Sequence, residues 1–430
     1  MRNMKESGHP WLGKIPANWD VVYPKMLFAQ RKDRAQQTDR QLTASQQHGV
    51  VYQDEYMEMT GARVVVVEKD FDILKHVEKG DFVISMRSFQ GGIEYSDNTG
   101  CISSAYVMLI PKKEYVHNRY FKWLLKSSTY INALQSTSNL VRDGQAMRYA
   151  NFIQVWLPLI PITEQVSIAE ILDKKCFEIG ALIANEQAQI DKLKAYKQSL
   201  ITEAVTRGLD SSATLKDSGI EWIGIIPAHW ETKRTKHIAR KFLKGNGITK
   251  DDIVEDGDSP CVRYGEIYTK YNICFDNCLT RTNLTNVPTP QYFENGDLLF
   301  VGTGELVEEI GKNVVYLGGE KCLAGGDIIV MQHSEDPLFL SFALNSTIAQ
   351  AQKSCSKAKL KVVHISSTDI GNVIIPLPPV DEQKQIAIFL LSKCEKIDKL
   401  ILIKQEKIAR LEQYKKSLIY EYVTGKKEVQ

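Results

Sequence analysis

Two stretches of the chain repeat an apolar position every three or four residues over an unusual length. The first runs toward Gly208 and the second toward Gly425, and neither pattern is interrupted by proline. The repeated positions are Ile168, Leu172, Ile179, Ile183, Ile190, Leu193 and Leu200 in the first stretch, and Ile386, Leu390, Ile397, Ile401, Ile408, Leu411 and Leu418 in the second. This period predicts two long amphipathic helices, each closed by its glycine. A helix of about 44 residues would be roughly 65 Å long.

The start of each predicted helix carries residues suited to a helix N-terminus. Thr163 and Asp381 can accept hydrogen bonds from free backbone N–H groups, and both are predicted as N-caps. Glu164 and Glu382 follow in the first turn, where a negative charge is favourable to the helix dipole.

Positions 179, 183, 186, 190 and 193 of the first stretch, all apolar except Glu186, follow one another at spacings of four, three, four and three, which predicts a coiled-coil seam. Neither helix could bury its stripe alone, and each is the natural partner of the other. With an internal pseudo-two-fold axis the helices would pair antiparallel, and full overlap sets Glu186 opposite Lys404 at the midpoint. We hypothesise that this pair fixes the register. The alternative is that both side chains extend to solvent.

The second stretch is a copy of the first. Residues 157–207 align without a gap on residues 375–425, with 24 identities in 51 positions. A shorter segment, "WLGKIPANW" at 11–19, returns as "WIGIIPAHW" at 222–230. The offsets are 218 and 211 residues, so the repeated pieces bracket two inserts of unequal length. The chain therefore contains the same pair of segments twice, and each pair encloses a different insert. We call the two repeated segments the frame.

The two inserts share only scattered features. "GDFVIS" at 80 and "GDLLFV" at 296 both predict a turn entering a strand, and "CISSAYVML" at 101 and "CLAGGDIIV" at 322 predict matching later strands. "YFKWLLKSS" at 120 and "LFLSFALNS" at 338 predict short helices. We expect an α+β protein with two globular mixed α/β domains joined by the two helices. The expected boundaries are 1–158 for the first domain, 159–210 for the first long helix, 211–376 for the second domain and 377–430 for the second long helix.

Composition narrows the class without identifying a partner. The chain has 43% hydrophobic and 25% charged residues and a net charge of only +2. It has no apolar run of membrane-spanning length and no N-terminal apolar signal, so we expect a cytoplasmic protein. The eight cysteines show no CxxC pair, which argues against a zinc site. Basic residues cluster at 31–34, 233–244 and 353–361, although such runs are often only solvated faces.

The duplicated motifs, "PLPP-DEQ--IA-FL" before each long helix and "W-G-IPA-W" before each insert, resemble the specificity subunits of type I restriction–modification systems along essentially the whole chain. The resemblance implies two target recognition domains, each reading half of a bipartite, asymmetric DNA target, held apart by an antiparallel helical spacer. It also implies assembly with two modification subunits, which would carry S-adenosylmethionine, and with ATP-dependent restriction subunits. This chain would hold no cofactor or metal and would have no catalytic residue of its own.

Base recognition favours Arg, Lys, Asn and Gln on loops, with further cations contacting phosphates. The candidate base-reading residues are loop residues of this kind in both inserts, together with one tyrosine in the second. In the first insert the candidates are Arg87, Gln90, Arg142, Gln145 and Arg148. In the second they are Arg263, Tyr264, Lys357, Lys359 and Lys361. Each is an ordinary surface residue by default.

One stretch favours an enzyme instead. "LLFVGTGEL" at 298–306 predicts a strand followed by a G-x-G turn, so a self-contained methyltransferase using Gly302 and Gly304 is the alternative. Only about eight residues separate this turn from the next strand-like run, which is too few for a crossover helix. No adenine methylase, Walker or zinc-protease motif occurs in the chain. A protein–protein scaffold built on the same coil is a further possibility.

Overall fold

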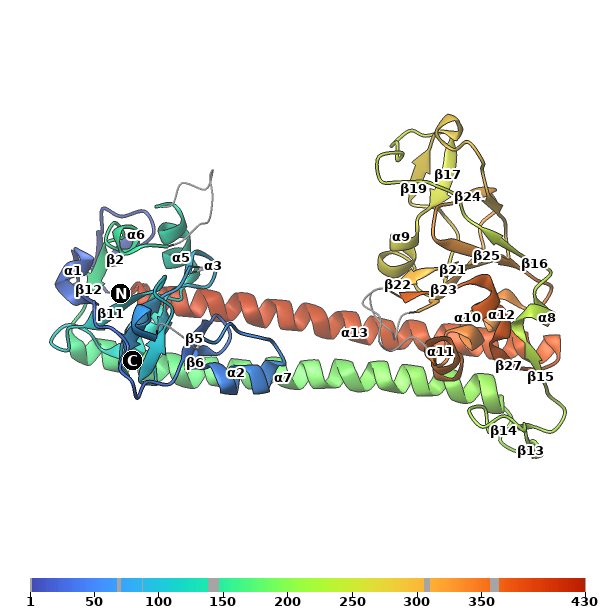
Figure 1. Ribbon diagram of the computed structural model, residues 1–430, viewed down its shortest axis with the longest axis horizontal. Helices are drawn as coiled ribbons and strands as arrows, with labels where there is room; N and C mark the ends of the chain where they lie inside the picture. The colour runs from blue at the N-terminus through green and yellow to red at the C-terminus, as the bar shows by residue number, and fades with distance from the viewer. Residues whose placement is uncertain are drawn as a thin grey trace. The chain divides into compact units, whose positions relative to one another are not determined.

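A computed structural model describes residues 2–67, 71–86, 88–137, 147–304, 310–355 and 363–429. The chain forms two compact units. The first unit contains residues 1–187 and 406–430, and the second contains residues 188–405. Figure 1 shows the elements of both units. The domain boundaries expected from the sequence stay a prediction.

Two long helices dominate the secondary structure, as the apolar pattern predicted. Helix α7 spans Ile162–Arg207 (46 residues) and helix α13 spans Val380–Val423 (44 residues). Both begin one residue before the predicted cap, so Thr163 and Asp381 lie inside the first turn and the N-cap prediction was wrong. The predicted ends are confirmed: Gly208 and Gly425 follow the helices with φ of 75° and 71°, the left-handed conformation that glycine adopts most easily.

The first unit is built on a four-stranded antiparallel sheet in the order β4-β11-β8-β9. Its strands are Phe28–Arg31, Val107–Pro111, Phe82–Ile84 and Glu94–Tyr95. Four further pairs are β1 (Met4–Glu6) with β2 (Lys14–Pro16), β3 (Asp20–Val22) with β12 (Leu157–Leu159), β5 (Leu42–Ser45) with β6 (Gly49–Tyr52), and β7 (Lys75–Val77) with β10 (Gly100–Ile102). The helices are α1 (Pro24–Leu27), α2 (Gln53–Thr60), α3 (Ser88–Gly91), α4 (Asn118–Leu124), α5 (Ser128–Gln135) and α6 (Tyr149–Phe152).

The second unit is built on a five-stranded sheet in the order β16-β25-β21-β23-β18. Its strands are Lys241–Lys244, Ile328–Gln332, Leu298–Val301, Asn313–Tyr316 and Cys274–Phe275. Three pairs accompany it: β13 (Leu215–Asp217) with β14 (Ile225–Pro227), β15 (Glu231–Arg234) with β27 (Ile374–Leu377), and β22 (Thr303–Gly304) with β26 (Val363–His364). The helices are α8 (Thr235–Ile238), α9 (Tyr264–Thr269), α10 (Pro337–Leu344), α11 (Thr347–Ser354) and α12 (Ser367–Asn372).

The second unit also contains a second, four-stranded sheet in the order β19-β17-β24-β20. These strands are Thr280–Thr282, Ser259–Val262, Cys322–Ala324 and Tyr292–Phe293. The sheet lies at the end of the unit farthest from α13, with the five-stranded sheet between them (Figure 1). It packs on buried clusters separate from the one that contains the long helices.

The two inserts share a fold, as the scattered similarities predicted. In both units an outer strand (β4 or β16) pairs antiparallel with a late strand (β11 or β25), which pairs with the strand entered from the Gly-Asp turn (β8 or β21). Gly80 and Gly296 in these turns have φ of 105° and 88°. The predicted short helices are α4 and α10. The scaffold is therefore common to both inserts. It extends to the distal strands, since β6, β5, β10 and β7 pair in the same order and senses as β19, β17, β24 and β20, although β5 reaches β10 only through the bridge between Gln41 and Cys101.

The repeated motifs meet in space, which explains why they are repeated together. In the first unit the buried Trp19 donates its indole N–H to Glu164 of α7 at 2.9 Å, and in the second Trp230 donates to Glu382 of α13 at the same distance. The next residue, Gln165 or Gln383, is also buried, and its side-chain amide hydrogen-bonds backbone groups of its unit. We call this arrangement the Trp–Glu lock.

Within each unit the long helices pack antiparallel. In the first unit Ile168 and Leu172, near the start of α7, share a core with Leu418 and Val423, near the end of α13. In the second unit Gln189 accepts a hydrogen bond from Lys404, and Lys197 forms an ion pair with Asp398 at 2.7 Å. Partner numbers thus rise on one helix as they fall on the other, and the predicted antiparallel coil is confirmed.

Polar residues occupy the middle of the seam. Glu186 is almost completely buried and forms an ion pair with Lys407 in the first unit. Lys404, its hypothesised partner, donates to Gln189 in the second unit. Both residues predicted to set the register therefore make polar contacts at the expected level of the helices, and their pairing with each other stays a prediction.

Candidate nucleic-acid interface

The candidate base-reading residues divide into two groups. Gln90, Arg148, Arg263 and Tyr264 belong to the described part of the chain. The other six lie outside the described residues: Arg87, Arg142, Gln145, Lys357, Lys359 and Lys361.

Gln90 is exposed on the short helix α3, whose position is fixed by its neighbours. The Ser88 hydroxyl accepts the Ser85 N–H at 2.8 Å, and the Gly92 N–H donates to the Ser88 carbonyl at 2.8 Å. Gly92 has φ of 83°, and a Cβ at this position would lie 2.5 Å from the Leu125 carbonyl oxygen. The glycines of "MRSFQGG" are therefore required for close packing, and the exposed Gln90 is the part of this turn that is free to meet a ligand.

Arg148 is exposed at the start of α6. Asn151 accepts the Arg148 backbone N–H at 3.0 Å and donates its side-chain amide to the Thr137 carbonyl at 2.9 Å. These bonds tie together the two points of the backbone that flank residues 138–146. Asn151 is thus a supporting residue that sequence reasoning missed, because its partner lies 14 positions away.

Arg263 is less available than predicted. It precedes α9, where its guanidinium lies 3.4 Å from the buried Glu266, and the Glu266 carboxylate also accepts the Arg263 backbone N–H at 2.9 Å. An intramolecular carboxylate competes with any base edge for this guanidinium. The neighbouring Tyr264 is 44% exposed and is the more accessible of the two. The i, i+3 spacing of Arg263 and Glu266 was a signal that sequence reasoning passed over.

The G-x-G segment has a structural explanation. Strand β21 leads into β22, which pairs antiparallel with β26, and the backbone of Gly302 bonds to Asp327 and Ile365. A Cβ on Gly302 would lie 3.0 Å from the Asp327 carbonyl oxygen. In the described part of this stretch the glycines thus belong to closely packed strands, whereas the methyltransferase alternative requires a turn that opens a helix.

One lysine of the basic run at 353–361 faces inward. Lys353 is buried and donates to the carbonyl oxygens of Gly311 and Leu344, both at 2.8 Å, and burial lowers the pKa of its ammonium to about 7. It stands seven residues after the helix cap Ser346, as the buried Leu134 stands seven residues after the equivalent cap Ser127. Comparing the two inserts would have predicted this burial, since the equivalent position is apolar.

A membrane-spanning helix and a metal centre are both absent from the described residues. No helix among them has the length and apolarity needed to cross a membrane. Within the same ranges, no group of three or more His, Cys, Asp or Glu side chains is placed to hold a metal ion.

Comparisons with known proteins agree with the duplicated motifs. Residues 227–413 match the family model of the type I restriction modification DNA specificity domain. The chain is 23% identical over 430 residues to the type I restriction enzyme MjaVIII specificity subunit of Methanocaldococcus jannaschii, covering 96% of this chain and 94% of that protein. It is 22% identical over 298 residues to the EcoKI specificity subunit of Escherichia coli K12, covering 66% and 60%.

A solved structure supports the fold over the full length. It comes from work on the structural basis of complex assembly and conformational transition of the type I R-M system. One of its chains matches with a TM-score of 0.68 at 14% identity, covering 95% of this chain and 98% of that chain. Together the comparisons confirm the resemblance predicted from the repeats, and none of them favours the methyltransferase alternative.

Proposed function

We propose how this chain, a specificity subunit of a type I restriction–modification system, recognises DNA: each insert reads one half of a bipartite and asymmetric target. The observation that carries this proposal is that the same Trp–Glu lock holds two inserts of unlike sequence, which therefore present unlike side chains on their surfaces. A common frame would orient both inserts in the same way on their helices. Unlike surfaces would then read unlike sequences, which makes the target asymmetric.

The long helices would serve as the spacer between the half-sites. The relatives are named as specificity subunits, and one matching chain comes from an assembled type I R-M system. We infer that this chain likewise works in a complex, with two modification subunits that carry S-adenosylmethionine and with restriction subunits. Base reading falls to Gln90, Arg148 and Tyr264, together with the six candidates outside the described residues. Arg263 is the weakest candidate because Glu266 holds it.

Exchange of one insert tests the bipartite reading. Residues 20–156 are replaced by the corresponding insert of a related subunit, the complete system is expressed in a host, and methylated sites are mapped by sequencing. We expect one half of the methylated sequence to change while the other half and the gap remain. A matched exchange of residues 231–374 should change only the other half. Both halves changing together would overturn the assignment of one half-site to each insert.

A further inference from the structure

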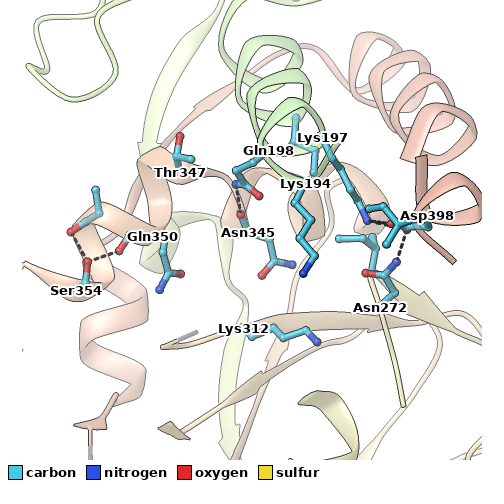
Figure 2. A pocket seen from close by; sticks show the side chains of 14 residues that line it. Lys194, Lys197, Gln198, Asn272, Lys312, Asn345, Thr347, Gln350, Ser354 and Asp398 are labelled. Atoms are coloured by element: carbon cyan, nitrogen blue, oxygen red, sulfur yellow. Dashed lines mark hydrogen bonds and ion pairs between the residues drawn. The ribbon is translucent and has the colours of Figure 1, made fainter. Parts of the chain in front are cut away.

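Cavities of different character lie beside the insert of the second unit. One has a volume of about 770 Å³, and Figure 2 shows the side chains that line it. Its carboxylate, Asp398, accepts from Lys197 at 2.7 Å and from Asn272 at 2.8 Å, so donors of the protein itself hold this group. Another has a volume of about 380 Å³, within the roughly 300–1,000 Å³ of ligand-binding pockets. It is lined by Trp222, by Arg234 and by residues of α11, α12 and the start of β27, and we call it the Trp222 pocket.

Strand pairing shows which residues of the first unit stand at the place of the Trp222 pocket. In the second unit Arg234 of β15 pairs with Ile374 of β27. The repeat offsets of 211 and 218 residues carry this pair onto Tyr23 and Trp156, one position beyond the β3–β12 ladder. The two places are therefore equivalent in the fold and differ in their side chains.

The first unit fills its place with aromatic side chains. The Trp156 ring stacks on His9, with centroids 5.4 Å apart, and meets Tyr23 edge-on at 5.9 Å. The Trp156 carbonyl accepts the indole N–H of Trp11 at 3.2 Å, and the Trp11 ring meets the buried Tyr130 edge-on at 5.4 Å. An indole packed against aromatic neighbours thus fills this place in the first unit.

The second unit keeps one of these aromatic residues and replaces the one that fills the place. Trp222 is the counterpart of Trp11 at the 211-residue offset, and it is 53% exposed. In the second unit the Ile374 carbonyl accepts the side-chain amide of Gln352 at 2.8 Å instead of an indole N–H. Since the Ile374 side chain is smaller than an indole, the Trp222 pocket lies in the space that Trp156 takes in the first unit.

The walls of the Trp222 pocket suit a flat aromatic ring. Trp222 contributes an exposed indole, and aromatic rings attract one another in stacked and edge-on arrangements. Arg234 is exposed, and its guanidinium lies 3.5 Å from the Asn372 side-chain oxygen, which belongs to the same wall. A guanidinium is flat and weakly hydrated, and it stacks on aromatic faces. Val373 and Ile374 add apolar surface. An aromatic ring can use all three kinds of surface.

We propose that the Trp222 pocket binds a planar aromatic ring the size of an indole or a purine, in the position that Trp156 takes in the first unit. The inference goes beyond DNA reading by the inserts and does not depend on it. Two sources can supply such a ring: an aromatic side chain of a modification subunit, or a free purine nucleoside. Because Trp156 fills the equivalent place in the first unit, a partner that carries such a ring would distinguish two units whose frames are alike.

The test uses the full chain with its six tryptophans replaced by fluorotryptophan, and it follows their fluorine NMR signals while indole is added. Single Trp→Phe variants assign the signals of Trp222 and Trp11. We expect the Trp222 signal to shift and to saturate with a dissociation constant on the order of 1 mM, as for a small ligand of modest efficiency. The Trp11 signal should stay in place. A Trp222 signal that does not move, or equal shifts of all the tryptophan signals, would overturn the proposal.

Two exchanges between the units serve as matched variants. Ile374→Trp gives the second unit the residue of the first, and the Trp222 signal should no longer respond to indole. Trp156→Ile makes the reverse exchange, and the Trp11 signal should then gain a response. The remaining tryptophan signals report whether each variant is folded. A full response in Ile374→Trp, or a silent Trp11 signal in folded Trp156→Ile, would overturn the equivalence on which the proposal rests.

A further arm separates the two sources of the ring. Adenosine and, in a second experiment, the modification subunit are added to the labelled full chain. A Trp222 shift with the subunit, together with loss of the response to indole, assigns the ring to a side chain of that partner. A saturable Trp222 shift with adenosine alone assigns the ring to a free nucleoside. If neither addition moves the Trp222 signal, the pocket has no ligand of this kind and the proposal fails.

Discussion

In both units of this protein the same residue types attach the insert to a long helix, and the two inserts differ farther from the helices. Trp19 and Trp230 are both fully buried, and both donate to a glutamate in the first turn of a long helix. Farther from the helices, the first unit has the pairs β5–β6 and β7–β10, joined by the bridge between Gln41 and Cys101, and the helix α2. The second unit has the equivalent strands in one continuous four-stranded sheet. The comparison teaches that the helix-facing side of each insert is constrained by buried hydrogen bonds, and the distal side is free to vary.

The largest expected effect comes from removing the indoles of the lock. Trp19→Ala should destabilise the first unit, and Trp230→Ala the second, each by about 3–5 kcal/mol, the cost of truncating a large buried aromatic side chain. Hydrogen exchange resolved by peptide would measure the unfolding free energy of each unit separately. Trp→Phe at either position keeps much of the ring packing, loses the bond to glutamate and should cost less. Clearly unequal losses in the two alanine variants would break the equivalence of the units.

The glycines after the long helices should distinguish the units. Both adopt a left-handed conformation, so alanine should cost about 1–2 kcal/mol at either site. A Cβ on Gly425 would also lie 2.5 Å from the Pro16 ring, whereas one on Gly208 would lie 3.1 Å from the Trp230 ring. Overpacking of this kind adds about 1–3 kcal/mol. Gly425→Ala should therefore lower the melting temperature more than Gly208→Ala, and the reverse order would contradict the geometry.

Lys353 should give the second unit a pH dependence that the first lacks at the equivalent Leu134. Burial lowers the pKa of Lys353 from 10.5 to about 7, so between these values the unfolded chain binds more protons than the folded unit. The unfolding free energy should therefore rise with pH in this window, by about 1.4 kcal/mol per pH unit at most. Denaturation of the wild type and of Lys353→Leu at several pH values tests this, because the difference between them should shrink as pH rises.

The smallest expected effect concerns two equivalent helix caps. The Ser127 hydroxyl accepts the Tyr130 N–H at the start of α5, and the Ser346 hydroxyl accepts the Ala349 N–H at the start of α11, both at 3.4 Å. Ser127→Ala and Ser346→Ala should each cost about 1 kcal/mol. Thermal melting of the two single variants should give matching losses. A loss in only one of them would show that the common frame ends before these helices.

The features that could be predicted from the sequence were those that occur in both copies of the repeat. The long helices, their glycine ends and the shared strands followed from the repeats, because the same apolar and glycine positions recur at a fixed offset. The role of Glu164 did not follow, because its indole partner lies 145 residues away. The burial of Lys353 was missed because the basic run was read as one surface patch. The distal sheet of the second unit was not predicted, because its strands β17 and β19 share no recognisable sequence pattern with β5 and β6, the strands that occupy the equivalent places in the first unit.

The division of the chain between the units sets an order of completion during synthesis. Residues 188–405 are contiguous, so the second unit has its full sequence before the chain ends. The first unit must wait for residues 406–430, since the Tyr120 hydroxyl donates to the Val423 carbonyl and Lys426 donates to the Leu12 carbonyl. The domain that leaves the ribosome first is thus the last to be finished. A nascent chain stopped at residue 405 would carry one complete unit and one with an open flank.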